Sequence, residues 1–191
     1  MMHVGIDYGS KLAGTTVLCW EQDGQLHYQQ SEKKKDADQW LIQLIQELSP
    51  PEVFIDAPLS LPAAYHGKGE DFFYRDCDRE LRAMSPMFLG GLTARAMKLR
   101  HLLSPQQIVF QETYPAELVR NLPDLKECYL KKKAMRADFL DKLQQLLPHP
   151  IHTMPTNWHQ ADAILAWMSG WRHQQNKAKQ IGRPEEGLII I

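Results

Sequence analysis

The chain has 191 residues and a formal net charge of −1, a length that suits one medium-sized domain with a substantial apolar core. The small net charge argues against long-range steering of nucleic acid, so any anion-binding surface must be local. Cys19, Cys77 and Cys128 are widely spaced, which argues against a disulfide framework or a cysteine zinc site and indicates a reducing compartment. The sequence shows no signal-peptide pattern and no apolar run near the roughly 18 residues that a membrane-spanning helix needs. We therefore expect a cytoplasmic protein without a membrane partner.

The first part of the chain predicts three strands followed by a helix. A short apolar run ends at Asp7, residues 14–20 are rich in β-branched side chains, and residues 25–30 follow an Asp-Gly turn signal. Apolar residues at helical spacing then cover 37–48, where Ser-Pro-Pro ends the pattern. Short turns between the three strands predict an antiparallel meander.

The rest of the chain predicts helices alternating with strands. The expected elements are a strand at 53–56, helical segments at 71–84 and 92–103, a strand ending at Glu112, helices at 134–147 and 158–173, and a terminal strand at 187–191. Helical crossovers place the later strands parallel to the first one. The fold class is therefore α/β, with a mixed sheet covered by helices on its faces.

Three of the predicted strands end in an acidic residue. The predicted strands end at Asp7, Asp56 and Glu112, and parallel strands would bring all three to one edge of the sheet. Carboxylates on neighbouring strands, about 4.8 Å apart, repel one another unless a cation lies between them. This pattern predicts a shared site for a hard divalent cation such as Mg²⁺. Taken singly, each residue is more typical of a loop or a helix cap.

Asp162 lies near the N-terminus of the last predicted helix. Its position alone is typical of an acid that interacts with the helix dipole, and His159 lies one turn before it. A metal-binding role for Asp162 needs information beyond this pattern.

The motifs resemble a known family of uncharacterised proteins, described as predicted nucleases of the RNase H fold. GIDYGSKLAGTTV, VFIDAPLSLP, RDCDRELR, QETYPAEL and QADAILAWMSGW occur here in the same order as in that family. The resemblance runs from about residue 3 to residue 172, and the terminal GRPEEGLIII also matches. It implies a single RNase H-like domain over 1–191, with a mixed five-stranded sheet flanked by helices. A helical insertion at about 63–107 would separate the fourth strand from the fifth.

The resemblance also implies an activity and a set of site residues. The activity is a metal-dependent nuclease that hydrolyses phosphodiester bonds, with Mg²⁺ or Mn²⁺ held by Asp7, Asp56 and Asp162. Glu112 matches a motif of this particular family, and it either joins the catalytic set or supports the metal ligands indirectly. Nucleic acid, either DNA or RNA, is the implied substrate.

Substrate binding by such a nuclease requires local cations. Arg75, Arg79 and Arg82 have the spacing of one helical face and are the candidate substrate-binding residues, although ordinary salt bridges explain the same pattern. The lysine runs at 33–35 and 131–133 are more typical of solvated loops or helix ends.

Two further functions stay open. A non-catalytic module that binds nucleic acid or nucleotides would keep the same fold and acidic pocket. The segment from Gly9 to Thr16 also resembles the first phosphate-binding hairpin of actin-like kinases and ATPases, in which Asp7 would position Mg²⁺. Those enzymes need two such lobes, so this interpretation requires a homodimer. The oligomeric state is otherwise left open.

Overall fold

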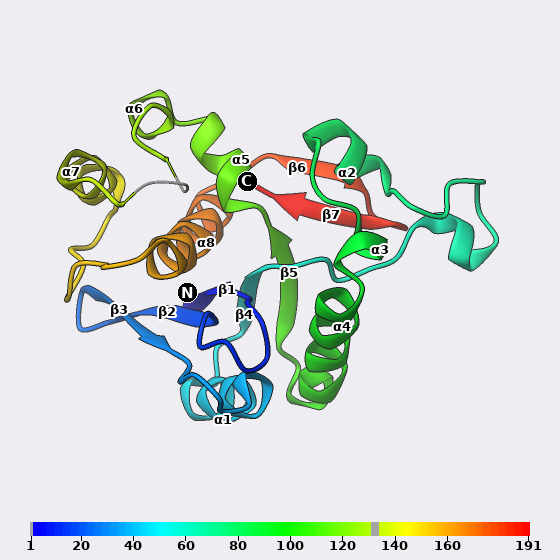
Figure 1. Cartoon of the computed structure of the whole chain (residues 1–191), viewed down its shortest axis with the longest axis horizontal. Coiled ribbons are helices and arrows are strands. Elements are labelled where there is room, and N and C mark those ends of the chain that lie inside the picture. Colours follow the sequence, from blue (N-terminus) through cyan, green and yellow to red (C-terminus); the bar gives the residue numbers. More distant parts are fainter. Residues whose placement is uncertain (1, 131–133) are drawn as a thin grey trace.

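The computed structural model describes residues 2–130 and 134–191, so the lysines at 131–133 lie outside the described residues. Its centre is a seven-stranded mixed sheet with the strand order β3-β2-β1-β4-β5-β7-β6 (Figure 1). The strands are β1 (His3–Asp7), β2 (Val17–Gln22), β3 (Gln25–Gln30), β4 (Glu52–Asp56), β5 (Val109–Thr113), β6 (Gln180–Arg183) and β7 (Gly187–Ile190). β1 to β3 form the predicted antiparallel meander, while β4, β5 and β7 continue the sheet in parallel from β1.

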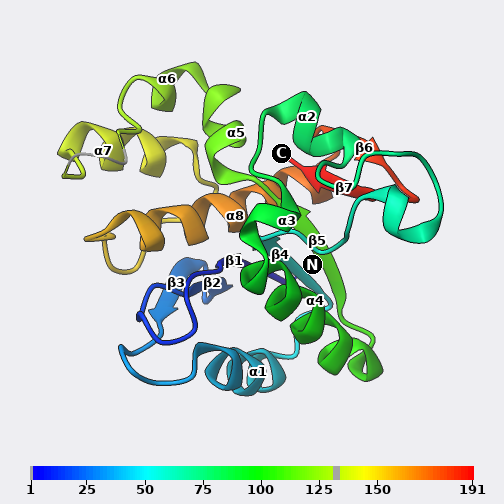
Figure 2. The same cartoon turned by 45° about the vertical axis from the view of Figure 1, so that its right-hand side comes forward.

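Helices cover both faces of this sheet. They are α1 (Ala37–Leu48), α2 (Asp76–Leu81), α3 (Pro86–Leu89), α4 (Gly91–Leu103), α5 (Pro115–Arg120), α6 (Pro123–Lys126), α7 (Ala137–Leu146) and α8 (Trp158–Gln174), with 3₁₀ turns η1 (Ala63–His66) and η2 (Ser104–Gln106). In Figure 2, α8 lies on one face with α5 to α7 beyond it, and α1 and α4 lie on the other face. Among the described helices, none has the length and apolar composition needed to cross a membrane.

The α/β class is confirmed, but the sheet has seven strands where the resemblance implied five. β7 matches the predicted terminal strand, whereas β6 was not predicted. β6 reads QIGR and has little alternation of apolar and polar residues, so its pairing with β7 is what makes it a strand. The short helices α5 and α6 were also missed, because four to six residues cannot show a helical period.

The segment between β4 and β5 is helical, as predicted, but its helices are shorter than expected. α2 begins only at Asp76 and ends at Leu81, where Arg82 adopts a left-handed backbone with φ +52°. Ser85 caps α3, and Gly90, with φ +43°, separates α3 from α4. A positive φ at that junction favours glycine because it has no Cβ.

Close contact between β1 and α8 determines where the site residues lie. Val4 and Ile6 belong to the apolar cluster on the α1 and α4 side of the sheet. The residues that alternate with them in β1, which are His3, Gly5 and Asp7, therefore face α8. At Gly5 an added Cβ would lie 2.0 Å from the backbone nitrogen of Trp167, so the two backbones are in direct contact. This contact brings the N-terminal half of α8 next to the end of β1.

Candidate functional site

Asp7 and Asp56 lie side by side at the carboxyl ends of β1 and β4. The two strands are parallel, and their register pairs these two residues. Val53 and Ile55 belong to the α1 and α4 side, so alternation directs Asp56, like Asp7, toward α8. Neighbouring strands are about 4.8 Å apart, so both carboxylates lie at one point of the sheet edge.

Asp162, in the second turn of α8, joins these two residues. Its side chain is buried, and its Oδ1 accepts a hydrogen bond of 2.7 Å from the hydroxyl of Tyr129. Burial raises the pKa of Tyr129, and the charges of Asp162, Asp56 and Asp7 raise it further. Three carboxylates from β1, β4 and α8 therefore act on a single hydroxyl group.

His159 contacts a different acid from the one that its position in the sequence pointed to. Its Nδ1 lies 2.8 Å from Oδ2 of Asp7, and 43% of its side chain is exposed. The ring links the first turn of α8 to the end of β1. His159 can thus orient the Asp7 carboxylate by a hydrogen bond, and by charge as well when the ring is protonated.

The side chain of Glu112 is directed to the other face of the sheet from these three acids. The register pairs it with Ile55 and not with Asp56, and strand alternation directs it to the α1 and α4 side of the sheet. There its carboxylate accepts hydrogen bonds from the Leu59 amide at 3.0 Å and from two guanidinium nitrogens of Arg75 at 2.7 Å each. Burial raises the pKa of Glu112, and the Arg75 charge partly offsets this effect.

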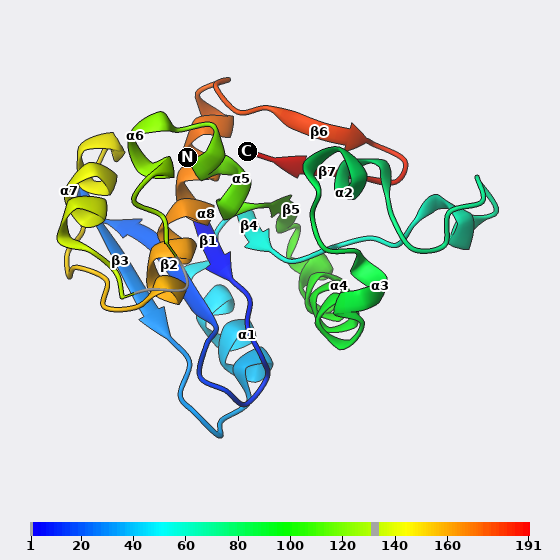
Figure 3. The same ribbon diagram turned by 45° about the horizontal axis from the view of Figure 1, so that its top comes forward.

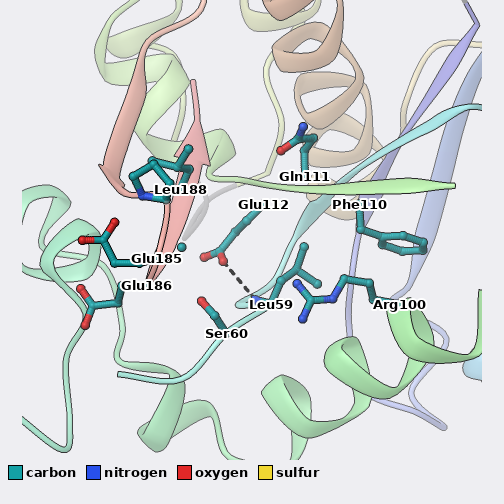
Figure 4. Close-up of a pocket in the computed structure, with 11 residues that line it drawn as sticks. Leu59, Ser60, Arg100, Phe110, Gln111, Glu112, Glu185, Glu186 and Leu188 are labelled. Carbon is teal, nitrogen blue, oxygen red and sulfur yellow. Dashed lines mark hydrogen bonds between the residues drawn. The ribbon is translucent and has the colours of Figure 1, made fainter. Parts of the chain in front are cut away.

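The residues around Glu112 connect the insertion to the sheet. Figure 4 shows its carboxylate directed toward Leu59 and near Ser60, in a cavity of about 290 Å³ beside the β6–β7 turn. Within that turn Glu186 accepts hydrogen bonds from the amides of Ala63 and Asp76. These contacts attach the insertion to the sheet.

The expected arginine face does not form. Arg75 precedes α2 and is only 1% exposed, with Asp78 and Glu112 as ion-pair partners. Arg79 lies on the surface, paired with Asp71, and Arg82 follows the helix. A shared face at this spacing needs one helix from 75 to 82, whereas α2 has six residues. The buried guanidinium of Arg75 is therefore a structural group and not a surface contact for substrate.

An open cleft of about 400 Å³ lies at the carboxyl ends of β1, β4 and β5. Its lining includes Asp7, Tyr8 and Asp56 from the ends of β1 and β4, and Asp78, Met84, Leu89 and Leu92 from the insertion. Glu112 also reaches its lining. Ligands of open α/β sheets bind at this edge, so the cleft is the natural position for a substrate next to the acids.

The donors in the cleft match a hard cation in chemistry. Asp7 and Asp56 provide carboxylate oxygens from adjacent strands, the ligand type preferred by Mg²⁺ and Mn²⁺. Within residues 2–130 and 134–191, no three His, Cys, Asp or Glu side chains converge closely enough to hold a metal ion. Asp162, the third acid, is hydrogen-bonded to Tyr129 in this arrangement.

The loop after β1 is closed by its own side chains. The amide of Gly9 donates to the Thr16 hydroxyl at 3.1 Å, and the amide of Ser10 donates to the Thr15 hydroxyl at 3.2 Å. A phosphate-binding hairpin uses such amides for its ligand. This geometry does not favour the actin-like interpretation.

Sequence reasoning missed Tyr129 entirely. Residues 128–130 show no periodic pattern or motif, and only the tertiary packing after α6 brings Tyr129 to Asp162.

No family model matches the chain, and no curated protein sequence is significantly similar to it. The function must therefore be argued from the geometry of the cleft.

Proposed function

We propose that the protein is a metal-dependent nuclease of the RNase H type, which hydrolyses phosphodiester bonds with Mg²⁺ or Mn²⁺ bound at Asp7, Asp56 and Asp162. The observation that carries this proposal is the register that pairs Asp7 with Asp56, both of which line the cleft, with Asp162 on α8 close enough that all three charges act on Tyr129. The strand order β3-β2-β1-β4-β5 agrees with an RNase H-like core, and β7 and β6 extend it.

The residues of the chain have distinct roles in this proposal. Asp7 and Asp56 are the ligands presented by the sheet, and Asp162 is the ligand presented by α8. A bound divalent cation would supply Lewis-acid stabilisation of the phosphoryl oxygens and would lower the pKa of a coordinated water. His159 orients Asp7, and the Tyr129 hydroxyl holds Asp162 in place. Loss of such supporting contacts commonly lowers metal affinity or activity by about 10- to 100-fold.

Glu112 is left out of the proposed metal site. Its carboxylate points to the other face of the sheet and is held by Arg75, so it supports the wall of the cleft. Arg75 is likewise left out of the substrate-binding set because it is buried.

A cleavage assay with matched carboxylate variants tests the proposal. Asp7→Asn and Asp56→Asn should each lower cleavage of single strands, duplexes, RNA–DNA hybrids or branched DNA by about 100-fold or more in Mg²⁺ or Mn²⁺. Asp23→Asn is the control, since Asp23 is an exposed turn residue with φ +53°, a conformation that Asn also adopts. Wild-type protein that cleaves none of these substrates, or folded Asp7→Asn that cleaves normally, would contradict the proposal.

A non-catalytic nucleic-acid-binding module is the second candidate. It is favoured by the absence of a converged three-ligand cluster among the residues described. Strand binding without turnover, unchanged in Asp7→Asn, would support it.

A further inference from the structure

The insertion carries an unusual concentration of exposed aromatic side chains. In the described part of the chain, every large aromatic residue with substantial exposure lies between residues 65 and 88: Tyr65, Phe72, Phe73 and Phe88. Phe73 and Phe88 are 56% and 62% exposed, and Met84, which precedes Ser85 in the chain, is 61% exposed. Clustered exposure of this kind marks an interaction site more often than scattered exposure does.

The rings of this cluster are held in a defined arrangement. The ring centroids of Phe73 and Phe88 are 5.9 Å apart with an interplanar angle of 37°, and Tyr74 meets Phe88 edge-on at 5.9 Å. The Ser85 hydroxyl donates a hydrogen bond to the Phe73 carbonyl and also caps α3. We call Phe73, Tyr74, Met84 and Phe88 the aromatic surface.

The aromatic surface is continuous with the acidic cleft. Met84 belongs to both, and Leu89, the neighbour of Phe88 on α3, lines the cleft with Asp7 and Asp56. Figures 2 and 3 both show α3 beside α4. A ligand bound at the carboxylates can therefore extend onto the rings without crossing another element.

Part of the chain that follows the first rings of the aromatic surface carries cations and no acids. From Arg82 to Gln111 the chain contains no Asp or Glu and four cations, Arg82, Arg95, Lys98 and Arg100, in a protein of net charge −1. Arg82, Lys98 and Arg100 are exposed. Arg95 instead ties α4 to the loop after β1, through Asp38 and the Gly9 carbonyl. Lys98 and Arg100 line other hollows, the first beside α1 and the second beside the β6–β7 turn, and the charged residues that line the cleft are all acidic. The cations near the rings are therefore Arg82, two residues before Met84, and Arg79, whose guanidinium lies 4.9 Å from the centre of the Tyr74 ring.

We propose that the aromatic surface binds unpaired bases of a nucleic-acid strand, which stack on Phe73 and Phe88 while the backbone passes Arg79 and Arg82 toward the cleft. Every base offers a π face, so this binding needs no sequence readout. As far as the strand is the substrate of the cleft, the inference rests on the proposed function. It adds that the preferred substrate is single-stranded or locally unpaired at the cleft.

Binding without turnover tests this directly. Fluorescence anisotropy in EDTA would compare a labelled 15-nucleotide oligo-dT, an oligo-rU of equal length, an abasic strand with the same phosphates, and a duplex. Phe73→Leu/Phe88→Leu keeps apolar bulk but removes the rings, whereas Phe73→Tyr/Phe88→Tyr keeps them. Leu102→Ala, at another exposed apolar position on α4, is the control for a general surface effect.

We expect the double Leu variant to bind oligo-dT and oligo-rU about tenfold more weakly or worse, and the double Tyr variant to stay within about twofold of wild type. The abasic strand and the duplex should bind weakly to all variants. Equal binding of the abasic strand, no binding of any strand, or full affinity in the double Leu variant would overturn the inference. Ring-dependent self-association in sedimentation would overturn it too, by assigning the surface to a second copy.

Failure of this inference is distinguishable from failure of the proposed function. Ring-dependent strand binding by a wild-type protein that cleaves nothing would remove the nuclease proposal and leave the base-stacking surface. Metal-dependent cleavage, lost in Asp7→Asn but equal for duplex and single strand and unaffected by the double Leu variant, would do the reverse.

Discussion

Replacing Arg75 with Met should destabilise the protein strongly at neutral pH. The Arg75 side chain is buried and donates five hydrogen bonds of 2.7 to 2.9 Å, to Ser60, Asp78 and Glu112. Met has a similar length but leaves two buried carboxylates without their cation. Removing one partner of a buried ion pair costs about 3–5 kcal/mol. For a chain of this length, that corresponds to a fall in Tm of about 6–20 °C.

The pH dependence of this variant tests the electrostatic cause. Burial already raises the pKa of Glu112 above its ordinary value of 4.5, and loss of Arg75 should raise it further. The folded state then holds a proton that the unfolded state releases, so folding stability falls as the pH rises from 4.5 through the folded-state pKa. The difference between Arg75→Met and wild type should therefore shrink as the pH falls toward 4.5.

Urea unfolding of both proteins at several pH values would measure this difference. Arg75→Met/Glu112→Gln is the matched control, because it removes the charge of one stranded carboxylate and should recover part of the loss at pH 7. A loss below about 1 kcal/mol, or a loss independent of pH, would refute the view that Arg75 is a buried counter-charge.

Three further predictions concern the cleft and its support. Gly5→Ala should lower the free energy of unfolding by about 3 kcal/mol or more, measured in urea, since its Cβ would overlap the α8 backbone; a change below 1 kcal/mol would contradict that contact. Tyr129→Phe should lower the free energy of unfolding by about 1–3 kcal/mol in EDTA, because buried Asp162 loses a hydrogen-bond donor. In thermal melts, the difference in stability between this variant and wild type should be smaller in Mg²⁺ than in EDTA. An equal difference in both would argue against metal at Asp162. His159→Ala should weaken Mn²⁺ binding by about tenfold in calorimetry with little effect on folding, and unchanged affinity would remove its orienting role.

Elements with complete local signals were predicted closely. α1 has the predicted bounds because its apolar period is long, Asp36 caps its start, and Ser49 in a left-handed conformation ends it. β3 has the predicted bounds because an Asp-Gly turn pairs it with β2. α2 fell short because the spacing of its apolar residues indicated a helix from 71, whereas the local caps begin it only at Asp76.

Among the acidic residues, the positions of Asp7 and Asp56 were predictable from local signals, and that of Glu112 was not. That Asp7 and Asp56 end parallel strands follows from apolar runs and crossover rules alone, and this was enough to predict a common edge. In the sequence Glu112 ends a predicted strand in the same way, so nothing local separates it from them, although β5 in fact continues to Thr113. Because Glu112 pairs with Ile55 and not with Asp56, its side chain lies on the opposite face of the sheet, where it accepts hydrogen bonds from Arg75.

The sequence by itself determined the α/β class, most helix and strand positions and the edge where carboxylates gather, because these depend on local period, caps and turns. Tertiary structure alone decided that Asp162 is buried against Tyr129, that His159 meets Asp7, and that Arg75 lies inside while Phe73 and Phe88 lie outside. Strand register and the packing of distant segments set these contacts. Register and packing depend on contacts between residues far apart in the chain, so they cannot be predicted from the spacing of residues along it.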